Sequence, residues 1–516
     1  MPRTKQQAWQ GKTGRLPARS PVPLRALALT GVVIAVSGMW GLVAGWWIPR
    51  GPLTSLESLA TMVIALIVGI VSGRVLGSRW AMLLAPAVFG AVFEVTRLGT
   101  DGPTVDGVTT STYGILAFIV GRGFHSVVGL VPMVLGAAFG AGIARRRDGQ
   151  PAGARRATAG LYFRRTVAAV TTVALIGLGI LLSRPAATAP ILDAGGQPRG
   201  GSIAELSTVD AGGKDLGLML RGASVENPVL LFLAGGPGGS ELGAMRNHLP
   251  KLEESFVVAT WDQRGTGTSY PALDPTATLT LESSIADAIT VTNHLRARFN
   301  QDKIYLLGQS WGSLLGVLAA QRAPELYRAF IGTGQMVSPV ATDRIFYEDT
   351  LAWAAKNGDT ALVGRLREIK APPYDRMLDY ETALSYEHEV YPYDSAGNSE
   401  GPGGFSENFI VPEYTLVDQI HLLGAFMDTF AALYPQLQDI DFRRTATTLE
   451  VPVYFVQGTH EADGRAEPFR EWYGVLNAPG KDVIELTTSG HRPLFEQPDE
   501  FVSYMTNTVL ARTPPS

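Results

Sequence analysis

The amino-acid sequence predicts a chain of two parts, an all-α membrane bundle followed by an α/β domain with a mostly parallel sheet. Its 516 residues exceed one ordinary domain, and 46% of them are hydrophobic, which is too apolar for a wholly soluble chain. Long uncharged runs lie in the first third of the chain. In the rest, short β-branched or aromatic runs alternate with helical periodicity, which is typical of a parallel sheet wrapped by helices.

The formal net charge of −4 hides two halves of opposite sign. Up to Arg184 the chain carries 19 Lys and Arg against 5 Asp and Glu, whereas the remainder carries 24 against 42. The basic residues lie beside apolar runs rather than in a folded basic domain, so nucleic-acid binding is not expected. With no cysteine and seven scattered histidines, the sequence predicts no disulfide, no metal site and no cofactor.

Five apolar runs predict a membrane region of about five helices over residues 26–183. The first, 26–48, has 23 uncharged residues and would reach roughly 34 Å as a helix, enough to cross a bilayer core. Gly136 and Gly140 have the GxxxG spacing that lets helices pack closely. The apolar stretch Gly114–Gly121 leaves open a re-entrant segment or a sixth crossing. The other four runs lie at 56–77, 80–96, 123–144 and 166–183.

Arginine and lysine counts predict the orientation of the bundle, because basic loops resist translocation across a membrane. Residues 1–25 form a basic tail, predicted to be cytoplasmic, and further basic residues cluster at 74–79 and 145–165. The two intervening loops carry only Arg50 and Arg97. Five spans from an inside start place the α/β domain outside the cytoplasm, whereas a sixth span would reverse this. The lipid bilayer is the predicted partner, and anchoring is the predicted role of the bundle.

The α/β domain follows a tether rich in alanine, proline and glycine at residues 184–201. We predict its core over 202–337 and 441–516, with 338–440 as a helical cap inserted between two strands. Seven strands are predicted from the β-branched and aromatic runs. They lie at residues 216–220, 229–233, 256–261, 304–308, 327–332, 451–458 and 482–486.

Ser310 is the predicted nucleophile. It is the centre of the segment GQSWG (308–312), which follows a predicted strand directly and opens a helical stretch. A G-x-S-x-G segment in this context forms a tight turn that projects the serine hydroxyl. Acyl transfer also needs N–H groups aimed at the oxyanion. The candidates are the backbone N–H of Trp311 and one from the glycine run after the second predicted strand, at Gly235 or Gly236.

The serine needs a base to take its proton, and the base needs a carboxylate to hold it. In the chain order serine, acid, histidine, the base is His491, which lies in the loop after the last predicted strand. The acid is expected just past the strand 451–458. Glu461 is the first candidate there and Asp463 the second. The acid would orient the histidine and stabilise its imidazolium form without taking the proton itself.

Three segments together resemble the proline iminopeptidase (prolyl aminopeptidase) branch of the α/β-hydrolases: GGPG (235–238), WDQRGTGTS (261–269) and GQSWG (308–312). The resemblance spans residues 215–335 and 450–505. It implies the α/β-hydrolase fold, with helices on both faces of a mostly parallel sheet, and an acyl-enzyme formed on the serine. It also implies that Asp262 and Arg264 support the site without taking part in the reaction.

The chain departs from that family at two positions, because it has Ala234 where the family usually has histidine and Glu461 where aspartate is usual. The resemblance further implies that the cap offers carboxylates to the free amino terminus of a substrate. Six acidic residues of the cap are available for this, and none is singled out: Glu348, Asp349, Glu387, Glu389, Glu407 and Glu413.

We therefore predict a membrane-anchored serine hydrolase that acts through an acyl-enzyme on small amide or ester substrates, most like an aminopeptidase. Its partner would be a small molecule or a short peptide. A carboxylesterase or lipase-like hydrolase is the first alternative. A hydrolase-fold sensor or docking module without catalysis is the second. No oligomeric state is predicted.

Overall fold

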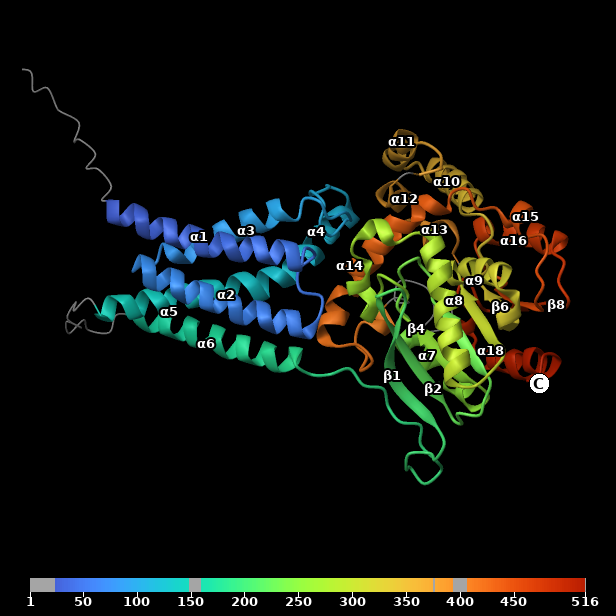
Figure 1. Ribbon diagram of the computed structural model, residues 1–516. Helices are drawn as coiled ribbons and strands as arrows, with labels where there is room; N and C mark the ends of the chain where they lie inside the picture. Colours follow the sequence, from blue (N-terminus) through green and yellow to red (C-terminus); the bar gives the residue numbers. More distant parts are fainter. Residues whose placement is uncertain (1–23, 148–158, 375, 393–405, 516) are drawn as a thin grey trace, which may run out of the picture.

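The computed structural model describes residues 24–147, 159–374, 376–392 and 406–515. The chain forms a helical bundle at one end and a larger α/β domain at the other (Figure 1). Three predicted features fall outside the described residues. They are the basic tail up to residue 23, the part of the basic loop that holds Arg155 and Arg156, and cap residues 393–405.

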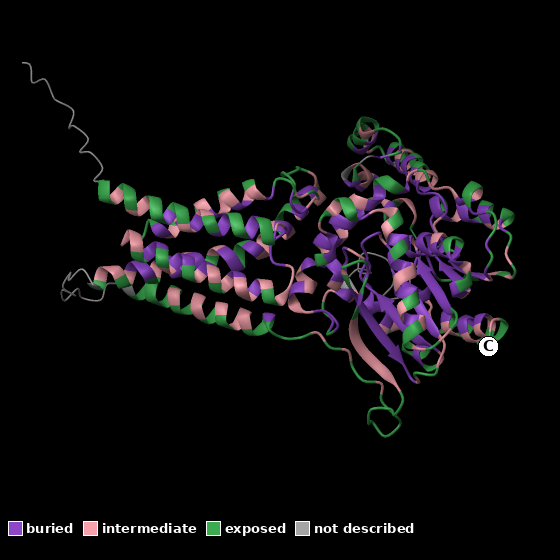
Figure 2. Ribbon diagram, in the orientation of Figure 1, coloured by how far each residue is buried: buried purple, intermediate pink, exposed green. Residues whose placement is uncertain are grey.

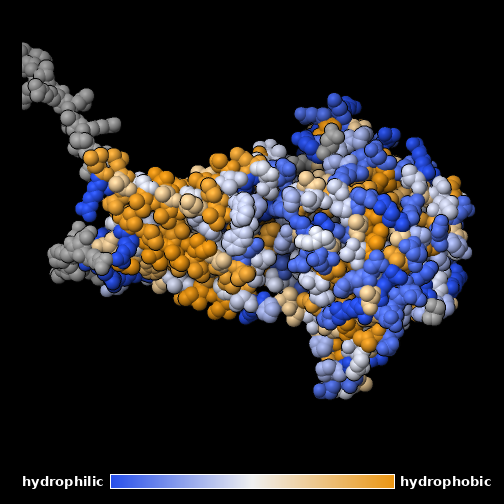
Figure 3. Space-filling view, in the orientation of Figure 1, coloured by the Kyte–Doolittle hydropathy of each residue, from blue (hydrophilic) through white to orange (hydrophobic). Residues whose placement is uncertain are grey.

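Six helices of the described residues form the bundle. They are α1 (Leu24–Trp47), α2 (Ser55–Leu76), α3 (Ala81–Thr96), α4 (Thr112–His125), α5 (Val131–Arg147) and α6 (Ala159–Leu182). By length and composition, five helical stretches within the described residues could cross a membrane: α1, α2, Thr112–Arg146, most of α6, and Leu416–Leu437 of the α/β domain. The helix α3 is apolar but shorter. Apolar residues cover the surface of the bundle (Figure 3), so it is consistent with a membrane region.

The apolar stretch Gly114–Gly121 lies inside α4. A π-helical turn, Ser126–Leu130, joins α4 to α5, so that Thr112–Arg146 forms one apolar helix of 35 residues. The stretch is therefore part of a longer helix and forms no separate helix of its own. At about 1.5 Å per residue such a helix is roughly 52 Å long, which exceeds a bilayer core of about 30 Å. The excess length lets α4 reach the α/β domain.

Glycines bring α2 and α5 into direct backbone contact. A Cβ atom on Gly73 would lie 2.1 Å from the carbonyl oxygen of Ala137, and one on Gly140 would lie 2.1 Å from that of Ile70. A Cβ atom on Gly136 would lie 2.3 Å from the carbonyl oxygen of Leu66 in α2. The GxxxG spacing thus serves the close approach of two helices, for which only glycine leaves room.

The α/β domain contains an eight-stranded sheet in the order β1-β2-β4-β3-β5-β6-β7-β8. The first two strands are antiparallel to their neighbours, and all the other pairs are parallel. The predicted fold class is confirmed. The strands are β1 (Ile203–Asp210), β2 (Asp215–Gly222), β3 (Val229–Leu233), β4 (Val257–Trp261), β5 (Ile304–Gln309), β6 (Tyr327–Thr333), β7 (Val453–Gly458) and β8 (Lys481–Leu486).

Helices cover both faces of the sheet, which is why its central strands are apolar along their whole length. The helices α8 (Leu281–Arg298), α9 (Trp311–Arg322), α15 (Phe442–Thr445) and α16 (Asp463–Val475) contribute to the core on one face. The helices α7 (Leu242–His248), α17 (Pro493–Glu496) and α18 (Pro498–Tyr504) contribute to the core on the other. Figure 2 shows the central strands as continuously buried, whereas the edge strand β1 is of intermediate burial.

The segment between β6 and β7 is mainly helical in its described part. Its α-helices before α15 are α10 (Pro339–Lys356), α11 (Thr360–Ile369), α12 (Met377–Leu384), α13 (Glu387–Val390) and α14 (Leu416–Leu433). The last of these lies where the α/β domain meets the bundle (Figure 1) and contacts α2, α4 and α6. One helix of the predicted cap therefore joins the two parts of the molecule.

Candidate active site

Ser310 stands at the sharp turn between β5 and α9. Its backbone has φ 54° and ψ −120°, a strained conformation for a residue with a side chain. The flanking glycines are required by space: a Cβ on Gly308 would lie 2.3 Å from the carbonyl oxygen of Gly312, and one on Gly312 would lie 2.0 Å from that of Leu233. The turn therefore has the form of a nucleophile elbow, with the hydroxyl directed away from the sheet.

Three predicted residues form one hydrogen-bonded chain. His491 Nε2 lies 2.8 Å from Ser310 Oγ, and His491 Nδ1 lies 2.6 Å from Glu461 Oε2. Glu461 follows the carboxyl end of β7, and His491 lies in the loop after β8. Because the carboxyl ends of parallel strands share one edge of a sheet, residues 181 and 30 positions apart in the chain meet there. The three residues follow one another in the chain as serine, acid and histidine, which is the predicted order.

Glu461 is held in its ionised form. Burial by itself would raise the pKa of this carboxyl, but the nearby positive charge of Arg465 and the contact with His491 outweigh it and lower the pKa to about 2. Arg465 Nε donates to Glu461 Oε1 at 2.7 Å, and the backbone N–H of Ala462 donates to the same oxygen at 2.9 Å. The second candidate acid, Asp463, is exposed at the start of α16. Of the two carboxylates, Glu461 is the one that contacts the histidine.

The candidate oxyanion donors lie beside Ser310. Trp311 is the first residue of α9, and the first N–H groups of a helix have no acceptor within it. The N–H of Gly235 is directed to Glu241, 3.4 Å away, which leaves Gly236 as the better placed of the two glycines. Gly236 has φ 123°, a conformation that favours glycine.

Asp262 and Arg264 do not line the cavity around Ser310. Asp262 accepts hydrogen bonds from the backbone N–H and hydroxyl of Thr268, both at 2.9 Å, and from the hydroxyl of Tyr414 at 2.9 Å. Burial raises the pKa of Asp262 to about 7. Arg264 binds Asp287 through two nitrogens, at 2.8 and 2.7 Å. Both residues hold the turn after β4 in shape.

Gln263, between these two residues, contacts the site more closely. Its amide donates to the carbonyl oxygen of Ala234 at 3.0 Å, and its carbonyl accepts from the indole N–H of Trp311 at 2.8 Å. It thereby links the two segments that carry the oxyanion candidates. Gln263 was not predicted from the sequence, although a polar side chain so soon after a buried strand could have indicated a role at the site.

A cavity of about 670 Å³ lies over Ser310. Four carboxylates line it, at Glu241, Asp343, Glu381 and Glu387. Burial raises the pKa of Asp343 to about 7 and raises the pKa of Glu241. The remaining wall is largely apolar and comes from the cap and from the loops at the sheet edge. It includes Leu314, Met336, Met377, Leu384, Leu423, Phe426, Met427, Phe430 and Leu437.

Glu387 is the one pocket carboxylate among the six cap acids available from the sequence, and it pairs with Arg465. Three of the others pair elsewhere: Asp349 with Tyr391, Glu407 with His248 and Arg492, and Glu413 with Arg246. Asp343 and Glu381 were not anticipated, because the inward face of a cap helix cannot be read from isolated acidic residues.

Two further residues of the pocket escaped the sequence reasoning. Arg465 stands four positions after Glu461, the spacing of an ion pair on one helical turn, and this spacing was a usable signal. Tyr113 lines the same cavity but belongs to α4 of the bundle, and nothing in the sequence pointed to it. Within the described part of the chain, no three histidine or acidic side chains gather to hold a metal ion.

Comparison with known proteins identifies the fold family of the chain. The profile of the alpha/beta hydrolase fold family matches residues 228–461. A Bacillus subtilis protein named "Probable aminopeptidase YbaC" is 30% identical over 317 residues, which are 59% of this chain and 96% of the relative. A Leptolyngbya boryana protein named "Probable proline iminopeptidase" is 28% identical over 54% of this chain and 88% of its own length. The crystal structure of a Mycobacterium smegmatis proline iminopeptidase, at 18% identity, covers 60% of this chain and 98% of its own with a TM-score of 0.44.

Proposed function

The chain belongs to the α/β-hydrolase family, and we propose that it is a membrane-anchored serine hydrolase that cleaves small amide or ester substrates through an acyl-enzyme. The observation that carries the proposal is the hydrogen-bonded chain from Ser310 through His491 to Glu461. A serine hydroxyl becomes a useful nucleophile when a base of this kind lies within hydrogen-bond distance.

In the proposed reaction, Ser310 Oγ attacks the carbonyl carbon of the substrate while His491 Nε2 takes the hydroxyl proton. The N–H groups of Trp311 and Gly236 stabilise the negative charge on the carbonyl oxygen. The imidazolium then returns its proton to the leaving amine or alcohol. A water molecule, activated by the same histidine, releases the acid and frees the serine. Glu461 keeps its charge throughout, because its pKa is about 2.

We further propose that the preferred substrate has a free amino group, as an aminopeptidase substrate does. The relative named an aminopeptidase matches this chain over 96% of its own length. An ammonium group is stabilised by carboxylates. Of the four that line the cavity, Glu387 pairs with Arg465 and Glu241 with Arg492, so Asp343 and Glu381 are the candidates to receive the group. The apolar wall of the cavity would accept the side chain of the first residue. Esters without an amino group are the alternative that the same wall supports.

The bundle would anchor this enzyme with its N-terminus in the cytoplasm and its hydrolase domain outside. The support is the set of apolar helices and, among the described residues, the arginines at the end of the bundle remote from the hydrolase domain, such as Arg79, Arg146 and Arg164. A membrane-impermeant fluorophosphonate tests this orientation. It should label Ser310 on intact cells, whereas labelling seen only after lysis would contradict the outside location.

The full chain in detergent tests the chemistry. It should react with a fluorophosphonate and hydrolyse L-prolyl and L-leucyl arylamides, and Ser310→Ala should abolish both. Ser503→Ala, an exposed serine of α18, is the matched control and should change neither. Labelling or turnover that persists in Ser310→Ala would contradict the proposed nucleophile. Turnover of p-nitrophenyl esters alone would replace the aminopeptidase proposal by an esterase.

A further inference from the structure

The helix α14 separates the candidate active site from the bundle. One of its faces lines the cavity over Ser310, through Leu423, Phe426, Met427 and Phe430. Every residue of the helix is buried or only partly exposed. The other face is covered by the bundle, so a contact made by the bundle lies one helix diameter from the substrate pocket.

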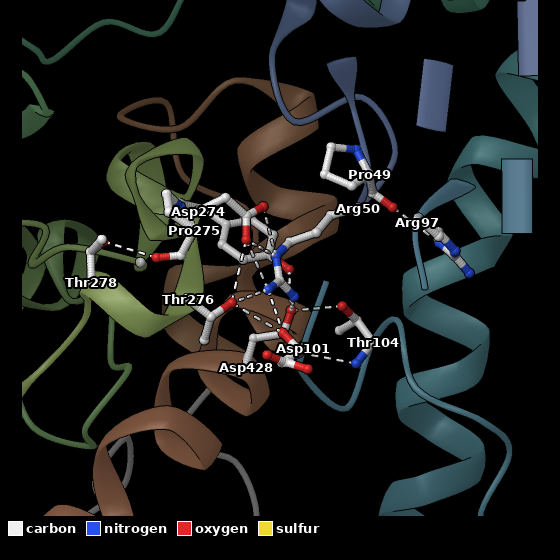
Figure 4. Close-up of polar contacts among 12 residues, drawn as sticks. Pro49, Arg50, Arg97, Asp101, Thr104, Asp274, Pro275, Thr276, Thr278 and Asp428 are labelled. Atoms are coloured by element: carbon white, nitrogen blue, oxygen red, sulfur yellow. Dashed lines mark hydrogen bonds and ion pairs between the residues drawn. The ribbon is translucent and has the colours of Figure 1, made fainter. Parts of the chain in front are cut away.

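Arg50 makes the central contact on that outer face. It lies in the loop between α1 and α2, and its side chain is 1% exposed. Its guanidinium binds Asp428 of α14 at 2.5 Å and Asp274 of the α/β domain at 3.1 Å. It also donates to the carbonyl oxygen of Asp101 at 2.6 Å and to the hydroxyl of Thr276 at 2.7 Å. Figure 4 shows this guanidinium at the centre of the cluster.

Asp428 is a fully buried carboxylate that draws on both parts of the molecule. From the bundle it accepts the backbone N–H of Thr104 at 3.0 Å and the hydroxyl of the same residue at 2.6 Å. From the α/β domain it accepts the hydroxyl of Tyr270 at 2.7 Å. Gly102 makes room for this cluster, because a Cβ there would lie 2.8 Å from Asp428 and 2.9 Å from Arg50.

The bundle also holds α14 at its beginning. His421 Nε2 lies 3.0 Å from the carbonyl oxygen of Pro52, in the same loop as Arg50. The ring of Phe124 on α4 meets that of His421 edge-on, with their centroids 5.5 Å apart. Val417 packs with Leu182, at the end of α6. The helix is therefore fixed by several loops and helices of the bundle over three of its turns.

The tip of α4 completes the pocket from another side. Tyr113 lines the cavity, and its backbone N–H donates to the pocket carboxylate of Glu381 at 3.1 Å. The bundle thus supplies one residue of the pocket wall directly and supports α14 from behind.

From these contacts we propose that Arg50 is a positioning residue that, through Asp428, fixes the apolar α14 wall of the pocket and so sets which acyl groups the enzyme accepts. This rests on the proposed serine hydrolase function. It gives the bundle a role in the active site beyond anchoring.

The physical reason is the buried charge of Asp428. Without Arg50 the carboxylate loses its counter-ion in a place that water does not reach, and a buried charge without a partner is unstable. The helix can relieve this by moving toward water, and its opposite face carries Phe426, Met427 and Phe430 with it. A displacement of this kind impairs the binding of a long acyl group that lies along α14. A short acyl group occupies only the end of the pocket near Ser310 and does not reach this wall.

The test compares hydrolysis of p-nitrophenyl octanoate and p-nitrophenyl acetate by the full chain in detergent, with enzyme concentration set by fluorophosphonate titration. In Arg50→Met we expect KM for the octanoate to rise roughly tenfold with kcat little changed, and kcat/KM for the acetate to stay within about twofold. Arg322→Met is the matched control, because Arg322 pairs with Glu282 on the surface of the α/β domain and should alter neither ester.

The inference is overturned if the ratio of kcat/KM for the octanoate to that for the acetate is the same in Arg50→Met as in the unaltered chain. This holds whether neither ester is affected or both lose equally, and an equal loss indicates general damage. If Arg50→Met yields no titratable enzyme, Thr104→Val decides the matter. It removes one hydroxyl donor from Asp428 and should raise KM for the octanoate about threefold, whereas no change would count against the inference. Turnover that survives Ser310→Ala would instead show that the serine hydrolase proposal itself fails.

Discussion

The bundle and the α/β domain are packed by different means. The sheet core is filled by large side chains that are less than 2% exposed, among them Phe232, Phe330 and Trp472. Between α2 and α5 the closest contacts are made by glycines against backbone carbonyl groups. In water, burial of apolar surface drives association, whereas helices in lipid gain little from it and depend on close van der Waals contact.

The outer surfaces differ in the same sense. Large apolar residues are exposed along the bundle, such as Trp46 at 80% and Val170 at 63%, whereas few described residues of the α/β domain resemble them. The two regions are therefore suited to different surroundings. Where they meet, apolar contacts are joined by buried ionic groups such as Arg50 and Asp428, which give the junction a defined geometry.

The largest expected effect concerns the proposed reaction, because the chain Ser310–His491–Glu461 lies entirely in the α/β domain. Glu461→Gln should lower kcat by about 10³- to 10⁴-fold, because the amide cannot stabilise the imidazolium and can impose the wrong tautomer on His491. Steady-state kinetics on the full chain measure this. Asp463→Asn should change kcat less than about twofold, and a large loss there would mean that the acid has been assigned wrongly.

An intermediate effect is expected from the glycine packing of the bundle. Gly140→Leu would force a side chain against the backbone of α2 and should lower the free energy of unfolding by about 3 kcal/mol, near the upper end for an overpacked site. Gly142→Leu is the matched control, since no atom lies within 4 Å of a Cβ at that position. Thermal denaturation in detergent compares the two variants. Equal stability would contradict the direct contact between α2 and α5.

The smallest effect is a pH dependence of stability that arises in the α/β domain, from Glu461. The folded protein lowers the pKa of Glu461 from 4.5 to about 2, so the stability it contributes is complete above pH 4.5 and is lost as the pH falls toward 2. Between pH 6 and pH 3 this loss is about 2 kcal/mol. Glu461→Gln cannot titrate, so the difference in Tm between it and the unaltered chain should shrink over this interval. A constant difference would show that the carboxyl is not held in its ionised form.

Local patterns were sufficient to predict most of the fold. The run at 229–233 forms β3 with the same bounds, because a short apolar run between turn residues has few other conformations. The sequence missed β1, whose residues are mostly half-exposed at the edge of the sheet and alternate too weakly to be recognised. An edge strand is stabilised by its neighbour, here β2, more than by its own composition.

The alternation of strands and helices and the candidate pair Ser310 and His491 could be predicted from the sequence, because each prediction depends on residues adjacent in the chain or on a fixed chain order. Tertiary structure alone decided that Glu461 and not Asp463 meets His491, and that Arg50 and Tyr113 of the bundle support or line the pocket. Arg50 and Asp428 are 378 residues apart. No local pattern records such a contact, because it arises only when two separately recognisable regions pack against each other and their buried charges must find partners.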